Sequence, residues 1–78
     1  MLKEKTLFAM DLTILMAVED LAYETGQSTE DILLSLMASE TGRRVYDDTQ
    51  KLWWDGPDAV IERYKRELEM NNPADGNN

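Results

Sequence analysis

Side chains that could do chemistry in this chain are mostly carboxylates. His and Cys are absent, so the usual zinc ligands are missing, and the serines at 28, 35 and 39 have no His to activate them. Neighbouring carboxylates occur as Glu19-Asp20, Glu30-Asp31 and Asp47-Asp48. Adjacent residues on a helix point about 100° apart, so these pairs do not share one site. We therefore expect no catalytic residue, no cofactor, no metal and no enzymatic activity.

DNA recognition is a second chemistry that the sequence raises. Arg43 and Arg44 follow a Gly-containing turn and precede Gln50 and Lys51, as in the second helix of a helix-turn-helix. The 16 acidic and 8 basic residues give a net charge of −8, which opposes binding to phosphates and to anionic membranes. A helix-turn-helix DNA-binding regulator is therefore the alternative function, and we expect neither nucleic acid nor a membrane as a partner.

The aromatic residues include two adjacent tryptophans, which cannot both face one core. We predict that Trp53 is a core residue. Trp54 is then either a lid over the following turn or an exposed anchor for a partner, because exposed tryptophan is enriched at binding hot spots. Tyr46 and Asp47 join Trp54 as candidate interaction residues.

Asp11 lies inside the apolar arc of the first predicted helix. A buried carboxylate must be paired or hydrogen-bonded. Two interpretations stay open: a half-exposed carboxylate near the helix start, or a buried polar residue paired with Arg43, Arg44 or a Trp or Tyr donor.

Glycines divide the chain into the elements that would position these residues. Gly26, Gly42 and Gly56-Pro57 separate four segments with helical periodicity, none of which alternates as a strand would. We predict an all-α fold, a compact four-helix array with short connections in a single domain over residues 1–70, and a disordered tail over 71–78. The expected helices span about 5–24, 28–42 and 43–54, and the last begins at Pro57.

The first predicted helix is apolar over more than half its circumference, so it faces a partner as well as its own core, or lies centrally. Leu12 and Met16 fall towards the rim of this apolar arc and are candidate contact residues for a homodimer. A 78-residue chain without disulfides gains from self-association, because it buries a modest share of its surface alone.

Two features bear on location. The lack of Cys fits a reducing compartment. The apolar run from Leu7 to Val18 is too short to cross a bilayer, and Asp11 interrupts it, which argues against a signal peptide. We expect a cytoplasmic protein.

A wider pattern begins with the Ser28-Thr29-Glu30-Asp31 helix start. It continues with Tyr46-Asp47, Leu52-Trp53 and Gly56-Pro57, and then with Ile61 and Tyr64. Over roughly 28–64 the chain resembles a group of small uncharacterised bacterial helical proteins, from whose pattern Asp48 and the doubled tryptophan depart. Members of that group look like companions of larger, separately encoded proteins, which implies an interaction role.

The function that these features favour is a small acidic, non-enzymatic protein-interaction module. It would associate with itself, or bind a basic or separately encoded protein.

Overall fold

The computed structural model describes residues 4–47 and 49–71. Within them lie the helices α1 (Glu4–Thr25), α2 (Thr29–Ala38), α3 (Glu40–Val45) and α4 (Pro57–Met70), and a single 3-10 turn, η1 (Leu52–Asp55). No strand occurs in this part of the chain, so the predicted all-α, four-helix fold is confirmed. The predicted tail lies outside the described residues from position 72 onward.

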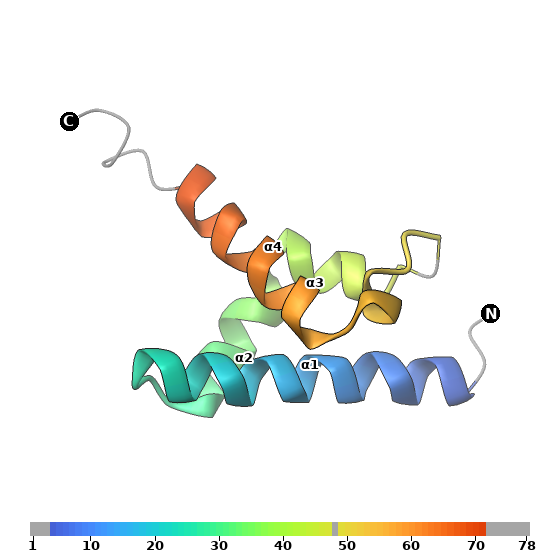
Figure 1. The fold of residues 1–78 in the computed structure, drawn as a ribbon, viewed down its shortest axis with the longest axis horizontal. Coiled ribbons are helices and arrows are strands. Elements are labelled where there is room, and N and C mark those ends of the chain that lie inside the picture. Colours follow the sequence, from blue (N-terminus) through green and yellow to red (C-terminus); the bar gives the residue numbers. More distant parts are fainter. Residues whose placement is uncertain (1–3, 48, 72–78) are drawn as a thin grey trace.

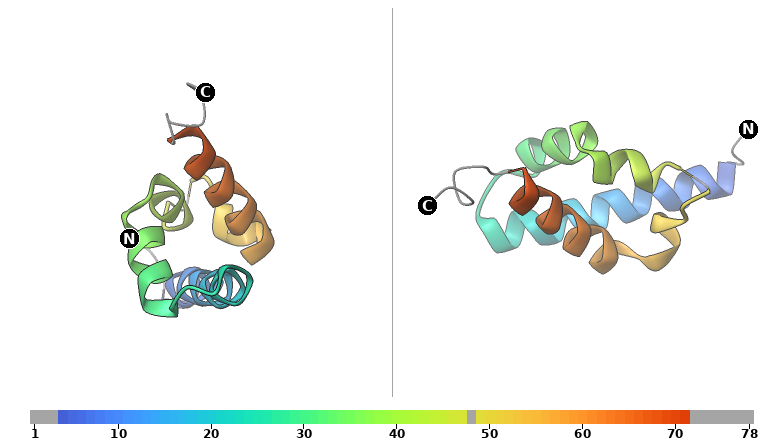
Figure 2. Two further views of the ribbon diagram at one scale, coloured as in Figure 1. Left: turned by 90° about the vertical axis from the view of Figure 1, so that its left-hand side faces the viewer. Right: turned by 90° about the horizontal axis from the view of Figure 1, so that it is seen from above.

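Helix α1 is the base on which the other elements pack. At 22 residues it is about 33 Å long. All other described elements lie on one side of it, with α2 and α3 along one flank and α4 along the other (Figures 1 and 2). The core between them consists of Met10, Ile14, Ala17, Val18, Leu21, Ile32, Leu36, Val45, Val60 and Tyr64.

The predicted end of α1 and the predicted starts of α2 and α4 are confirmed. The φ of Gly26 is +76°, a left-handed conformation that suits glycine, and its amide donates to the Ala22 carbonyl at 2.9 Å. Ser28 caps α2 by accepting from the Asp31 amide at 3.1 Å. Pro57 is the first residue of α4.

The predicted boundary between the second and third helices at Gly42 is wrong. Helix α2 ends at Ala38, and α3 begins two residues later, after an extended Ser39. The Ser39 hydroxyl donates to the Leu36 carbonyl at 2.5 Å and accepts from the Gly42 amide at 3.0 Å. One serine thus caps two helices, and Gly42 lies buried inside α3.

The third helix is also shorter than the predicted 43–54, because it ends at Val45. The Asp47 carboxylate accepts from the amide of Thr49 at 3.0 Å and from its hydroxyl at 2.6 Å, a local turn that competes with helix hydrogen bonds. Lys51 has a φ of +53°, which no α-helix accommodates. The tryptophans therefore lie on η1 and not on a continuation of α3.

Candidate functional site

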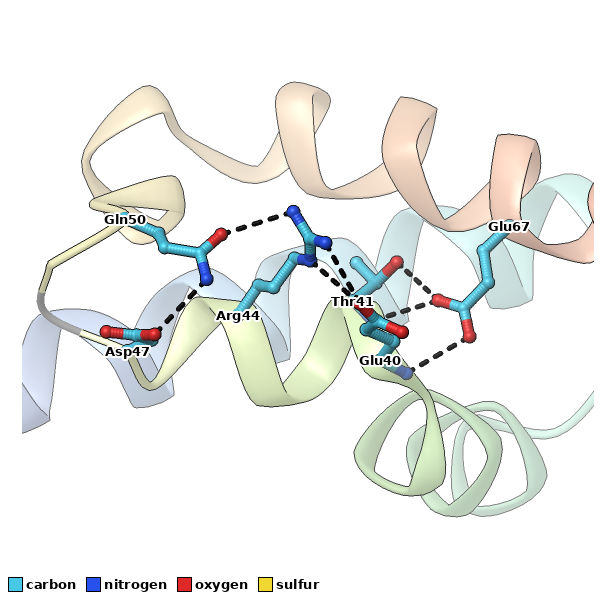
Figure 3. Close-up of polar contacts among 6 residues, drawn as sticks. All are labelled: Glu40, Thr41, Arg44, Asp47, Gln50 and Glu67. Atoms are coloured by element: carbon cyan, nitrogen blue, oxygen red, sulfur yellow. Dashed lines mark hydrogen bonds and ion pairs between the residues drawn. The ribbon is translucent and has the colours of Figure 1, made fainter.

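The Glu67 carboxylate accepts three hydrogen bonds and reaches from α4 to the first turn of α3 (Figure 3). It accepts from the Glu40 amide at 3.0 Å, the Thr41 amide at 2.9 Å and the Thr41 hydroxyl at 2.6 Å. Because Ser39 accepts from the next amide, all three leading N–H groups of α3 have partners. A helix of six residues is too short to be stable alone, so this cap holds α3 in place.

The pKa of Glu67 reflects this arrangement. Burial acts to raise the pKa, but the hydrogen bonds from Thr41 and Glu40, and the nearby positive charge of Arg43, lower it below its usual range. A carboxylate with a lowered pKa in the folded state stabilises the fold above its unfolded pKa of about 4.3, and this contribution is lost as the pH falls through the folded pKa.

Glu67→Gln should therefore lower the free energy of unfolding at pH 7 by about 1–2 kcal/mol, because the amide cannot replace a charged acceptor at a helix N-terminus. The variant should also lose less stability than the wild type as the pH falls below about 4.3. Urea melts between pH 7 and pH 3 measure both effects. The matched control is Glu62→Gln on the same helix, where an exposed ion pair to Arg66 contributes little. Parallel pH curves for the wild type and Glu67→Gln would contradict the assignment.

A cleft of about 330 Å³ adjoins this cap between α3 and α4. Its basic lining residues are Arg44, Arg63 and Arg66. Arg44 donates to Glu40 at 2.9 Å and to the Gln50 side chain at 3.2 Å, and Arg66 donates to Glu62 at 3.3 Å (Figure 3 shows the Arg44 contacts). The Arg44–Glu40 and Arg66–Glu62 contacts each lie within one helix, and the contact of Arg44 with Gln50 joins α3 to the turn that follows it. Arg44, one of the two arginines that the alternative DNA-binding function would use, is thereby engaged within the protein.

Asp11 is on the surface, so its interpretation as a buried polar residue is wrong. It nevertheless has one of the partners that the sequence proposed, because the half-buried Tyr46 hydroxyl donates to its carboxylate at 2.5 Å. Burial raises the pKa of Tyr46, and the neighbouring Asp11 carboxylate raises it further. The pair connects α1 to the end of α3, and Asp47, next in the chain, is occupied by its contacts with Thr49 and with Gln50.

The two tryptophans separate as expected in exposure, although less sharply. Trp54 is 73% exposed, as predicted. Trp53 packs against the core, but it is only partly buried and not among the buried core residues that the prediction placed it with. Their rings meet edge to face with centroids 5.6 Å apart. The Trp53 carbonyl accepts from the Thr13 hydroxyl at 3.3 Å, while its buried Nε1 has no partner among the described residues.

The outward side of α1 carries a row of exposed large apolar side chains. Phe8 is 68% exposed, Leu12 46%, Leu15 52% and Met16 44%. Their spacing places them on the side of the helix opposite the core, where no other described element packs (Figures 1 and 2). We call these four residues the outward row.

The outward row contains Leu12 and Met16, which the sequence had singled out, together with Phe8 and Leu15, which it had not. The sequence did indicate that Phe8 and Leu15 share a side of the helix with Leu12, since both lie at helical spacing from it. No local signal marked Glu67, because its partners Glu40 and Thr41 are more than twenty positions away in the chain.

No group of three His, Cys, Asp or Glu side chains in the described residues is placed to bind a metal ion. Among the described helices, none combines the length and the apolarity needed for a membrane crossing.

Comparisons with protein-family models, curated proteins and solved structures show no match to this chain. The resemblance inferred from the Tyr46-Asp47, Leu52-Trp53 and Gly56-Pro57 pattern therefore stays a prediction.

Proposed function

We propose that this protein is a non-enzymatic protein-interaction module whose contact surface is the outward row of α1. The observation that carries the proposal is the exposure of four large apolar side chains on one side of one helix. Together they present roughly 400 Å² of apolar surface, comparable to the largest patch on a typical monomer, which is often a binding site.

The chemistry of the rest of the chain supports a binding role over a catalytic one. The chain contains neither Cys nor His, the residues on which many nucleophile and general-base mechanisms depend. The polar side chains that do gather are engaged within the protein. Glu67 bonds from α4 to α3, Arg44 bonds within α3 and to Gln50, and Asp47 bonds within its own turn. The outward row, in contrast, contributes nothing to the core and leaves apolar surface in water.

A photo-crosslinking amino acid placed at position 15 tests this proposal in cells. It should capture protein, and the same group at position 68 on α4 should capture far less. Leu68 is a matched control because 51% of it is exposed, against 52% of Leu15, and it belongs to a different helix. Mass spectrometry of the crosslinked species identifies the captured protein. Equal capture at the two positions would refute the outward row as the contact surface.

A further inference from the structure

Three residues of the outward row, Phe8, Leu12 and Leu15, follow a seven-residue spacing along α1. Lys5, Leu12 and Glu19 recur at intervals of seven, and Phe8, Leu15 and Ala22 recur three residues after each of them. The spacing is that of the a and d positions along which two helices pack, but the first set is apolar only at Leu12, and Ala22 packs against the core. The first set begins with a cation, has an apolar residue at its centre and ends with an anion, and all three residues are exposed.

The charges of Lys5 and Glu19 on two copies of α1 attract each other in one relative orientation of the helices only. If two α1 helices pack antiparallel around Leu12 and Leu15, Lys5 of each lies within one helical turn of the partner's Glu19. Parallel packing would instead place Lys5 beside Lys5 and Glu19 beside Glu19, which is repulsive. A surface that matches its own copy after a twofold rotation is the defining property of an interface in a symmetric dimer.

We propose that a second copy of this chain covers the outward row, with the two α1 helices antiparallel and Leu12 of one copy against the partner's Leu15. This inference rests on the proposed function and names the partner. The apolar surface of each copy is small, so the dimer is expected to be weak, with a dissociation constant on the order of 10–100 µM. The unobstructed side of α1 leaves room for this approach (Figure 2).

The first test is sedimentation equilibrium from 5 to 500 µM. The wild type should pass from the 9.0 kDa monomer to a species of twice that mass. Leu15→Glu should remain a monomer throughout this range, because it places a charge in the apolar centre of the seam. Leu68→Glu, equally exposed on α4, should dimerise like the wild type. Circular dichroism of both variants at 5 µM should match the wild type, since neither residue is in the core.

The second test exchanges the charges at Lys5 and Glu19 and shows whether the two α1 helices pack antiparallel. Lys5→Glu and Glu19→Lys should each weaken the dimer, by about tenfold at low salt, because each replaces two attractive pairs by two repulsive ones. The two single variants change the net charge in opposite directions from −8, so an effect of overall charge alone would weaken one and strengthen the other. The double variant should regain wild-type dimerisation. Lys5 and Glu19 are about 21 Å apart along one helix, so this recovery requires contact between copies.

The outcomes separate the two proposals. A wild type that stays monomeric at 500 µM overturns the second copy as partner, and capture of a different protein at position 15 would then leave the interaction function standing. Dimerisation that Leu15→Glu abolishes but that the charge exchange does not restore overturns the antiparallel arrangement. Dimerisation unaffected by Leu15→Glu overturns the outward row as the interface and, with it, the proposed contact surface.

Discussion

Gly42→Ala is expected to destabilise the fold by at least about 3 kcal/mol, out of a total of roughly 4–12 kcal/mol for a domain of this size. A Cβ atom at position 42 would lie 2.1 Å from the Leu36 carbonyl oxygen and 3.2 Å from the Met37 Cα. Both are backbone atoms, so no side chain can rotate away to relieve the clash. The same oxygen accepts hydrogen bonds from the amide and the hydroxyl of Ser39, so the shift needed to make room would also disturb the junction of α2 and α3.

At an ordinary helix position, replacing glycine by alanine has the opposite effect on stability. In a helix interior alanine is about 1 kcal/mol more favourable than glycine, and on propensity alone the substitution in α3 would stabilise the protein. Urea melts of Gly42→Ala provide the measurement, with Gly26→Ala as the control. At Gly26 an added Cβ would meet nothing within 4 Å, and only the strain of its positive φ remains, about 1–2 kcal/mol. A gain in stability for Gly42→Ala would show that α3 and α2 do not approach this closely.

Trp53→Ala should be the next most damaging change, with a loss of about 2–4 kcal/mol. This is less than for a fully buried tryptophan, because the indole of Trp53 is half-buried at the edge of the core. Trp54→Ala should cost below about 1 kcal/mol, since 73% of that residue is exposed and its main contact is the ring of Trp53. The midpoints of denaturant melts measure the contrast.

A further variant separates the size of the Trp53 ring from its polar group. Trp53→Phe retains an aromatic side chain and removes the buried Nε1 donor, which has no partner among the described residues. Its cost should therefore stay below about 1.5 kcal/mol, because the lost packing is offset by removal of an unsatisfied donor. Large and equal losses for Trp53→Ala and Trp54→Ala would mean that both rings are structural. Trp54 would then no longer be a candidate anchor.

The outcome at the outward row shows what a hydrophobic pattern can and cannot predict. The width of the apolar arc on the first helix indicated that some of its residues face away from the core, and Leu12 and Met16 do so. The pattern could not predict which of the other apolar residues in the arc are most exposed. Phe8 is more exposed than Leu12, although phenylalanine more often packs inside, because the direction from which α2 and α4 approach decides which part of the arc is covered.

The sequence by itself determined the elements whose signals are local. The Gly26 end of α1, the Ser28 cap of α2 and the Pro57 start of α4 depend on neighbouring residues and were predicted from them. The helical class follows from apolar periodicity over the whole chain, and the net charge and the lack of Cys and His follow from composition.

The conformation of residues 39–47 and 49–55 depends on tertiary contacts and could not be predicted from neighbouring residues. Helix α3 depends on Glu67, whose carboxylate arrives from another helix to satisfy its first amides. Gly42, which by itself looks like a helix terminator, is required instead for the close approach of α3 to the carbonyl of Leu36. The stability of such a segment comes from contacts between residues that are distant in the chain, so neighbouring residues alone do not predict it. Tertiary contacts likewise determine that Trp53 is half-buried and that Asp11 is exposed.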